Sequence, residues 1–547
     1  MTVQTRIVSE DRATAVLDSA HVGDITGAFG TIRVGDEAPR SGLKARIMTL
    51  LAIVGPGLIV MVGDNDAGAF GTYTQAGQNY GTSLLWTLLL LVPVLYVNQE
   101  MVLRLGAVTG VGHARLILER FGKFWGAFSV IDLFILNALT IVTEFIGISL
   151  GLDFLGLPKV AGVLVSAVVI VAAASTGSFR RFERVCLTLV AGSLVLIPIF
   201  LMVHPPMREV ARDLVIPRMP EGAELSGVVL LIIGIVGTTV APWQLFFQQS
   251  YVIDKRITPR FIGYEKIDLW IGIAIVVIGA TAMISFTSAA FAGHPEFGHF
   301  DDASGVARGL AKYVSPMAGT LFAIALIDAS IIGAAAVGLS TSYALGDVFG
   351  LRHSLHRKVH EAKAFYAMFI AILLGSAVIV LIPGSPLGLL TVGVQVLAGI
   401  LLPSATVFLL LLCNDRHVLG PWVNGTKMNL FTAAVIAVLV ILSLVLTAQV
   451  LFPSISSGAI VRMLVGGSIA SVLGAAGYLL YRRVKPGRPQ EAPPRGERAS
   501  WRMPPLALLG APKLSIETRL GLLVLRTYLL IAMILVVVRV VQLALGH

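Results

Sequence analysis

The stretch that decides the fold is residues 55–70, GPGLIVMVGDNDAGAF, in which an apolar run stops at two carboxylates flanked by glycines. Residues 47–62 are apolar enough to lie in a bilayer, and the chain turns apolar again over 84–97. A carboxylate at membrane depth is costly unless it faces a partner or a water-filled cavity. We therefore take Asp66 as a candidate functional residue. The alternative is a loop at the membrane surface, where Asp and Gly are common.

Apolar windows of membrane-spanning length recur along all 547 residues. The mean hydropathy is +0.86, with 56% hydrophobic and 13% charged residues, which excludes a soluble globular protein of this size. Since a span needs about 20 apolar residues, we predict an all-α polytopic membrane protein with twelve helices before residue 484. The first helix runs over 47–63 and continues, broken, to 78. The others cover 82–104, 126–151, 158–175, 186–203, 226–251, 266–292, 314–345, 363–383, 388–413, 428–452 and 460–481.

Basic residues gather in alternate predicted loops, as in Arg180, Arg181 and Arg184, and again in Lys255, Arg256 and Arg260. The loops between them are short or acidic. Because positively charged loops stay in the cytoplasm, we expect a cytoplasmic N terminus and an integral protein of a bacterial plasma membrane. The net charge of +10 then follows from topology and does not indicate a nucleic-acid partner.

A second interrupted helix lies at residues 234–244, GIVGTTVAPWQ, where Pro242 breaks the sixth apolar span. Proline removes a backbone donor and clashes with the preceding turn, so a simple kink is the alternative interpretation. The break in the first span lies one five-helix unit earlier. Interruptions at corresponding positions of two halves indicate an inverted-repeat transporter with a site at the bilayer midplane. Such breaks are tolerated where they line a cavity.

This pattern predicts a 5+5 helix core with broken helices 1 and 6 and additional C-terminal helices. The predicted parts are a polar cytoplasmic tail (1–46), a first repeat (47–204), a second repeat (205–413), helices 11 and 12 (414–483), a Pro/Arg-rich cytoplasmic linker (484–515) and a thirteenth membrane helix (516–547). Arg526 and Arg539 leave a surface-lying helix as the alternative for the last part.

Short motifs within residues 50–415 resemble those of the Nramp family of divalent-metal transporters. The most specific is residues 99–110, QEMVLRLGAVTG, which is similar to the family's Arg-Leu-Gly-x-Val-Thr-Gly stretch. Residues 144–147, EFIG, resemble the third-helix Glu-x-Ile-Gly, and Gln395 followed by Pro403 resembles the tenth-helix Gln…Leu-Pro pattern. Each motif is short, but their order and spacing match together. The resemblance implies transport of divalent metal ions by alternating access.

The chain departs from that family's pattern at the metal ligands. Where the family has Asp-Pro-Gly-Asn in the first helix, residues 66–69 read DAGA, so Asp66 keeps the acid and Ala69 replaces the asparagine. Where the sixth helix has Met-Pro-His-Asn, residues 241–244 read APWQ, so Ala241 replaces the thioether. A branch of Nramp-related magnesium transporters resembles this departure.

Only oxygen donors then remain at the predicted site. They are Asp66, Gln395, Asp64, Gln244 and the carbonyls near Gly63 and Thr238. A thioether is a soft ligand, whereas an all-oxygen set suits a hard cation. Mg²⁺ usually keeps several waters, and the loss of two side chains is expected to widen the cavity. We predict import of Mg²⁺, with Mn²⁺ also carried. The ion is cargo, and no cofactor is expected.

Proton coupling in the family is associated with titratable residues that this chain lacks. The two sixth-helix histidines correspond to Trp243 and Gln248, and an acid in the third helix corresponds to Ile141. Histidine suits a proton relay because it titrates near neutrality. Glu144 is retained, either in the pathway or as a neutral structural residue. We therefore predict uptake without obligatory proton coupling.

Several alternatives remain open from the sequence. Asp64 either lines the cavity or lies in a solvated loop, and Asp328 either lines a polar pathway or makes a helix–helix hydrogen bond. The protein could instead be an ordinary proton-coupled Mn²⁺/Fe²⁺ transporter. It could also carry an organic cation against Trp243 by a cation–π contact, or be a non-transporting sensor. No nucleotide-binding loop or nucleophile motif is present, so we expect no enzyme. The expected partners are the metal ion and the lipid bilayer, and the oligomeric state is not predicted.

Overall fold

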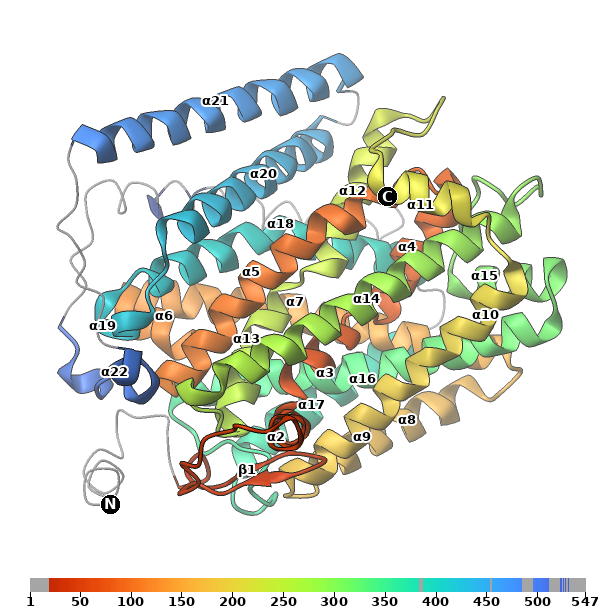
Figure 1. Cartoon of the computed structure of the whole chain (residues 1–547). Coiled ribbons are helices and arrows are strands. Elements are labelled where there is room, and N and C mark those ends of the chain that lie inside the picture. Colours follow the sequence, from red (N-terminus) through yellow and green to blue (C-terminus); the bar gives the residue numbers. More distant parts are fainter. Residues whose placement is uncertain are drawn as a thin grey trace.

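The structure, a computed structural model, describes residues 19–382, 387–452, 455–484 and 495–510, with five isolated positions between 522 and 530. Almost all of the described chain is helical (Figure 1). The first half contains α2 (Leu43–Ile53), α3 (Pro56–Val62), α4 (Ala67–Tyr80), α5 (Trp86–Thr109), α6 (His113–Phe121), α7 (Lys123–Phe154), α8 (Lys159–Ala174), α9 (Phe179–Gly192), η1 (Ser193–Val195) and α10 (Leu196–Val203).

The second half follows the same order of long helices. It contains α11 (Met207–Val215), α12 (Leu225–Thr239), α13 (Pro242–Asp254), η2 (Pro259–Phe261), α14 (Ile262–Phe291), α15 (Ala303–Tyr313), α16 (Pro316–Phe349), α17 (Lys363–Val380) and α18 (Leu387–Cys413). The remaining elements are α19 (Arg416–Leu419), η3 (Gly420–Trp422), α20 (Thr426–Leu451), α21 (Ser457–Val484), α22 (Arg495–Ser500) and η4 (Leu506–Leu508).

The predicted membrane helices are present. Within the described residues, ten helices are long and apolar enough to cross a membrane, and the bent pair α2 and α3 makes an eleventh. The apolar helix α8, at 16 residues, is shorter. These elements lie over the twelve predicted spans, so the prediction of an all-α polytopic membrane protein is confirmed. The predicted thirteenth helix lies almost entirely outside the described residues.

Both predicted helix breaks are present, and they meet in the core. The first lies between α3 and α4, where Asp66 has extended backbone angles and begins α4. The second lies between α12 and α13, where Ala241 is extended and Pro242 is the first residue of α13. Proline is favourable at this position because the first helical N–H has no intrahelical partner. The helices around the breaks pack closely, with α14 along α3 and α4, α12 along α18, and α7 along α16.

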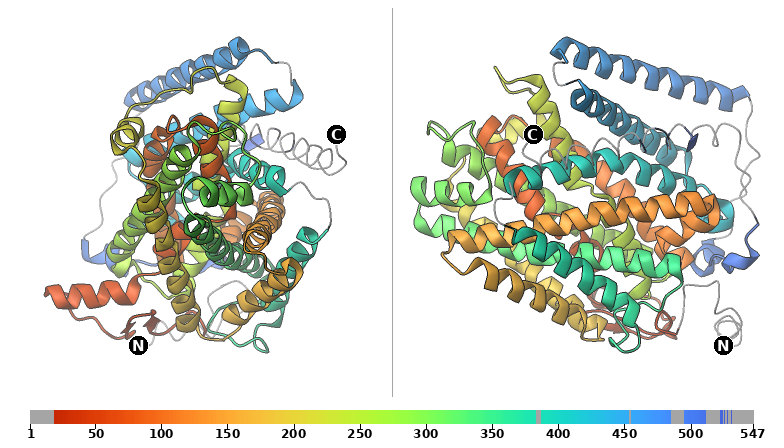
Figure 2. Two further views of the ribbon diagram at one scale, coloured as in Figure 1. Left: turned by 90° about the vertical axis from the view of Figure 1, so that its right-hand side faces the viewer. Right: turned by 180° about the vertical axis from the view of Figure 1, so that it is seen from behind.

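The helices α20 and α21 lie at one edge of the molecule, away from the two breaks (Figures 1 and 2). The helix α21 exposes a row of apolar side chains that includes Val465, Ile469 and Val472. Such a surface suits contact with lipid, because lipid tails are as apolar as these side chains. These helices therefore add to the core without forming its centre.

Residues 19–42 fold back onto one end of the helix bundle. The short strands β1 (Ile25–Thr26) and β2 (Thr31–Ile32) pair antiparallel, with Ile25 opposite Ile32. The side chains of Arg180 and Arg184 donate to backbone carbonyls of this segment, and so does Arg256. We call this end of the bundle the hairpin face. The end that carries α11 and α15 is the opposite face (Figure 1).

One predicted loop residue is not in solvent. We counted Lys255 among the basic loop charges, but its side chain is fully buried near the hairpin face. Its Nζ donates to Glu183 Oε1 at 2.6 Å and to the carbonyls of Ile53 and Val54 at 2.6 and 2.8 Å. The basic stretch predicted as a loop therefore contains one buried structural lysine and two arginines that bind the N-terminal segment. Lys255 holds the α2–α3 bend from inside, whereas Arg256 and Arg260 bind the N-terminal segment.

The described part of the predicted linker also packs on the hairpin face. Trp422 Nε1 donates to the carbonyl of Arg498 at 2.8 Å, and the guanidinium of Arg120 donates to the carbonyl of Gly510 at 2.7 Å. Residues 495–510 therefore contact the end of α6 through Arg120 and the short helix η3 through Trp422, and the N–H of Met503 donates to the carbonyl of Val108 on α5. The sequence alone predicted only a Pro/Arg-rich connection here.

Candidate metal-transport site

Asp66 lies at the centre of the core, at the start of α4. Its side chain is 3% exposed, and its Oδ1 accepts a hydrogen bond from the backbone N–H of Ala69 at 2.9 Å. Aspartate is a preferred residue at this helix position because it satisfies a free N–H group, and the helix dipole favours negative charge there. The carboxyl group of Asp66 also lies close enough to that of Glu144 to interact with it. Ala69 thus serves the site through its backbone, since its methyl group cannot ligate a cation.

Glu144 lies beside Asp66. Its Oε2 accepts from the backbone N–H of Ala67 at 3.1 Å, while its buried Oε1 has no hydrogen-bond partner. Gly333 on α16 faces both acids: a Cβ built there would lie 2.8 Å from the Glu144 carboxyl carbon and 3.0 Å from Asp66 Cβ. The close approach of α16 therefore requires glycine at this position. Three helices, α4, α7 and α16, bring the two carboxylates together.

Gln395 lies between the two broken helices. It lies on α18, is 2% exposed, and its Nε2 has no hydrogen-bond partner. A Cβ on Gly68 would overlap the Gln395 amide, and a Cβ on Gly237 would overlap its backbone carbonyl. Gln395 thus lies against the start of α4 and the end of α12. The sequence predicted Asp66 and Gln395 as ligands, and the structure brings them to the same place.

Asp64 is fully buried, and neither of its carboxylate oxygens has a hydrogen-bond partner. The amide of Gln244 is close enough to act on this carboxylate, although it does not reach hydrogen-bond geometry. Gln244 Oε1 instead accepts from Gln99 Nε2 at 3.0 Å, which leaves its own Nε2 unpartnered. Buried polar groups are normally satisfied. The unsatisfied oxygens of Asp64 are therefore available to a cation, and the loop alternative for this residue does not fit its burial.

Trp243 fills space next to the first break. Its side chain is 1% exposed, and a Cβ on Gly63 would lie 3.8 Å from the tip of its indole ring. The backbone carbonyl of Trp243 accepts from Ser340 Oγ at 2.9 Å, which fixes the start of α13 against α16. The indole occupies the space beside Gly63. The wider cavity expected from the missing side chains remains a prediction.

The other predicted residues divide into two groups. Thr238, near the end of α12, has a buried hydroxyl without a hydrogen-bond partner, and both amide atoms of Gln248 on α13 are likewise unsatisfied. Ala241 supplies extended backbone at the second break. Asp328 is different: it is half-buried on α16 and lies against Gly192 of α9, on another side of α16 from Gly333. The structure therefore does not bring Asp328 to Asp66.

Sequence reasoning missed several polar residues near the breaks. Tyr73 on α4 and Thr239 on α12 share a hydrogen bond of 2.7 Å between their hydroxyl groups, which ties the two broken helices together. Asn65, between the two acids, donates to the carbonyl of Val276 on α14 at 3.3 Å. Their only signal in the sequence was a polar side chain within an apolar span.

The ligand set is mixed rather than a cluster of strong metal-binding side chains. Among the described residues, no group of three or more His, Cys, Asp or Glu side chains is arranged to hold a metal ion. A cation at Asp66 would be held by carboxylate, amide and carbonyl oxygens. Such donors suit hard divalent cations, and a partly hydrated ion would retain water at the remaining positions.

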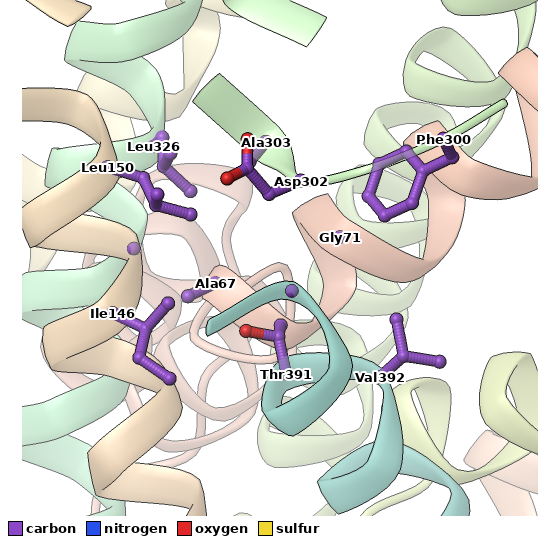
Figure 3. Close-up of a pocket in the computed structure, with 12 residues that line it drawn as sticks. Ala67, Gly71, Ile146, Leu150, Phe300, Asp302, Ala303, Leu326, Thr391 and Val392 are labelled. Carbon is purple, nitrogen blue, oxygen red and sulfur yellow. The ribbon is translucent and has the colours of Figure 1, made fainter. Parts of the chain in front are cut away.

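A cavity of about 270 Å³ approaches Asp66 from the opposite face (Figure 3). It reaches Ala67, the residue after Asp66, and is bounded by α4, α7, α16, α18 and the start of α15. In Figure 3 the side chains of Ile146 and Leu150 from α7 and of Thr391 from α18 surround it. Of the described residues that line it, Asp302 alone is charged. The cavity is a mostly apolar approach with one acidic residue at its rim.

Comparison with known proteins agrees with this architecture. The family model for natural resistance-associated macrophage protein-like (Nramp) proteins matches residues 57–449. The chain belongs to the Nramp family. It is 30% identical over 423 residues to the divalent metal cation transporter MntH of Ralstonia nicotianae, covering 74% of this chain and 92% of that protein. It is 27% identical over 425 residues to the protein of the same name in Latilactobacillus sakei, covering 73% and 90%.

A solved structure of the same fold is the manganese transporter of Eremococcus coleocola in complex with an aromatic bis-isothiourea substituted compound. It superimposes with a TM-score of 0.60 at 21% identity, covering 82% of this chain and 98% of that chain. This likeness confirms the predicted inverted-repeat Nramp core. The curated relatives are named as transporters, so the chain belongs to a family of divalent metal transporters and not of enzymes. The metal is a substrate in such a protein, not a cofactor.

Proposed function

We propose that this Nramp protein imports divalent cations by alternating access, with Mg²⁺ preferred and Mn²⁺ also carried. The observation that supports this best is the convergence of Asp66 and Gln395 at the two helix breaks. Next to them lies Asp64, with two buried and unsatisfied carboxylate oxygens. A buried carboxylate without a partner is unfavourable. A bound divalent cation would supply the missing charge and accept these oxygens as ligands.

The proposed preference for Mg²⁺ rests on the donor chemistry at the second break. Ala241 stands where the resemblance to the family has a methionine, so the side chain offers no sulfur. Without a soft ligand, the site loses its advantage for transition metals over Mg²⁺. The neighbouring Thr238, Gln244 and Gln395 offer only oxygen and amide groups.

The proposed energy source is the membrane potential together with the metal gradient. The arginines that bind residues 19–42 gather at the hairpin face, and positive residues favour the cytoplasmic side. We propose that the hairpin face is cytoplasmic. A divalent ion moving toward it then gains about 4.6 kcal/mol per 100 mV of inside-negative potential, which suffices for uptake without a second ion.

The absence of obligatory proton coupling is proposed from the residues around the site. Trp243, Gln248 and Ile141 cannot exchange protons near neutral pH. Glu144 accepts a hydrogen bond from the N–H of Ala67, which gives it a structural role at the start of α4. A proton-coupled manganese transporter is the second candidate. The contact of Glu144 with the Asp66 segment favours it, because paired acids can share a proton.

Flux measurements in proteoliposomes of purified protein test these alternatives. Mg²⁺, Mn²⁺ and Ca²⁺ are compared under an imposed inside-negative potential, with a pH dye inside the vesicles and Asp66→Ala as the control. We expect Mg²⁺ and Mn²⁺ uptake that follows the potential without acidification. Acidification that follows metal uptake would favour the proton-coupled candidate. Transport of organic amines that ignores metals would favour an organic-cation carrier with Trp243 as its aromatic wall.

A further inference from the structure

A second cavity lies on the other side of the helix breaks. It is lined by α7, α13 and α18, and its empty space, open solvent included, is about 320 Å³. Pro242, the first residue of α13, lines it, and Ala241 of the predicted transport site is the preceding residue. From Pro242, α13 runs toward the hairpin face, where it ends at Asp254. The two cavities therefore flank the breaks from opposite faces.

Asp132 is the charged residue of this second cavity. It lies on α7, its side chain is 8% exposed, and its Oδ1 has no hydrogen-bond partner. Of the described residues that line the cavity, Asp132 alone is charged. The predicted span 126–151 already contained this acid, but nothing in the sequence showed that it would face α13 rather than another helix.

The burial of Asp132 requires an explanation. An ionised carboxylate within a membrane-spanning helix is rare unless it pairs with a cation or lines a wet pathway. Here no protein cation lines the same cavity among the described residues. A cation that binds this carboxylate would supply the missing charge.

Two serines add side-chain oxygens to this cavity. Ser129 on α7 and Ser404 on α18 line it with Asp132, and the other described lining residues are apolar. Ser404 Oγ donates to the carbonyl of Leu401 at 2.8 Å, and its lone pairs remain able to accept or to ligate. One carboxylate and two hydroxyl groups make a weak, water-completed site for a hard divalent cation.

Asp132 is also distant from the site at Asp66. It precedes Glu144 by twelve residues on α7, which at the helical rise of 1.5 Å per residue corresponds to about 18 Å along the axis. Glu144 contacts the Asp66 segment. Asp132 and Glu144 therefore lie at different depths along α7.

We propose that Asp132 is a second, weaker binding position for the transported divalent cation, between the Asp66 site and the hairpin face. The ion released at the breaks moves along α13 and rests at Asp132 before it leaves. The proposal rests on the proposed transport function. The proposal adds a step between the Asp66 site and the hairpin face that depends on the charge of Asp132. It also requires that the cavity between α7 and α13 is maintained.

The test compares Asp132→Asn with two other variants of the full-length protein. Asp328→Asn is the matched control, because Asp328 is another acid within a membrane helix but lies against α9. Asp66→Asn removes the principal ligand. Mn²⁺ binding is measured at equilibrium by electron paramagnetic resonance, and Mn²⁺ flux is measured in proteoliposomes.

We expect Asp132→Asn to lose a weak Mn²⁺ site while the tight site keeps its dissociation constant. Its maximal flux should fall roughly tenfold with little change in KM, because a slower exit step lowers turnover rather than binding. Asp132→Glu should restore most of the flux, and Asp328→Asn should behave as the wild type. Loss of flux in Asp66→Asn with binding at Asp132 retained would support both proposals.

Two outcomes would overturn the role of Asp132. One is unchanged Mn²⁺ stoichiometry and flux in Asp132→Asn. The other is equal damage in Asp132→Asn and Asp132→Glu together with lowered thermal stability, which would indicate packing. If the wild type shows no Mn²⁺ flux above empty vesicles, the proposed transport function fails. If Asp66→Asn transports as the wild type does, Asp66 is not the principal ligand, and both results are distinct from the two outcomes for Asp132.

Discussion

Two groups of buried acids in this protein differ in whether a basic side chain lies beside them. Near the hairpin face, Glu183 contacts Lys255 at 2.6 Å and accepts from the N–H of Ala28 at 2.5 Å. Asp268 there accepts from the N–H groups of Gly55 and Gly57 at 3.2 and 2.7 Å through Oδ2, while its Oδ1 has no hydrogen bond. Lys255 lies near enough to act on the charge of Asp268. At the helix breaks, Asp64 has no hydrogen-bond partner, and Glu144 leaves one oxygen unsatisfied.

This difference indicates that the acids near Lys255 support the fold, whereas the acids at the helix breaks are available to a ligand. A buried pair with its hydrogen bonds fixes the helices that contribute it, and the Lys255 group holds the α2–α3 bend to α9 and α14 in this way. The acids at the breaks have no basic partner, and acids of this kind within membrane helices typically line a wet pathway or bind a ligand. Glu265 is an intermediate case, because its buried oxygens lack hydrogen bonds while Lys255 lies near enough to act on its charge.

Replacement of the central acid should have the largest effect. Asp66→Asn keeps the shape of the side chain and its cap on Ala69, so we expect normal folding but Mg²⁺ and Mn²⁺ flux near that of empty vesicles. Flux in proteoliposomes and the thermal unfolding temperature in detergent measure the two properties. Substantial flux in this variant would show that the acids at the helix breaks are not needed for transport, which would contradict their assignment as functional residues.

Replacement of the buried lysine should damage stability instead. Lys255→Met leaves Glu183 buried without its cation, which typically costs about 3–5 kcal/mol. Lys312→Met is the matched control, since Lys312 and Glu296 form an exposed pair at 3.1 Å and such pairs contribute about 0–1 kcal/mol. Thermal unfolding in detergent should show a large loss for the first variant and almost none for the second. Equal losses would contradict the structural role of Lys255.

Return of the sulfur should change selectivity more than stability. Ala241→Met adds a soft ligand at the second break, so we expect Mn²⁺ to gain on Mg²⁺ by about tenfold, or 1.4 kcal/mol. Competition of the two ions for flux at fixed total metal measures the shift. Unchanged competition would show that Ala241 does not face the ion.

Crowding of Gln395 should have the smallest effect of the four. A methyl group on Gly68 would overlap the Gln395 amide, and such overpacking costs about 1–3 kcal/mol. We expect Gly68→Ala to raise the KM for Mg²⁺ several-fold while the protein still folds. Gly263→Ala on α14 has open space around it and serves as the control. If both variants behave alike, Gln395 does not lie at the site as described.

The sequence predicted the fold well because lipid makes hydropathy decisive. The spans, the breaks at Asp66 and Pro242 and the family followed from local patterns of apolar residues, Gly, Pro and acids. The sequence did not predict the burial of Lys255 or the isolation of Asp328 from the site. From the sequence, Lys255 was predicted to be a loop charge and Asp328 to be a pathway candidate. Both predictions depend on which helix packs against the residue, and the sequence does not show this.

The sequence by itself determined the membrane helices, the two interruptions and the presence of an acid at the first of them, since each arises from residues within a few turns of one another. Only the tertiary structure decided which polar groups meet. Gln395 lies against Gly68, two residues after Asp66, although more than three hundred residues of chain separate them, and Asp132 lines a cavity together with residues of α13. Whether a buried charge is satisfied depends on neighbours that are distant in the chain, and local pattern carries no information about them.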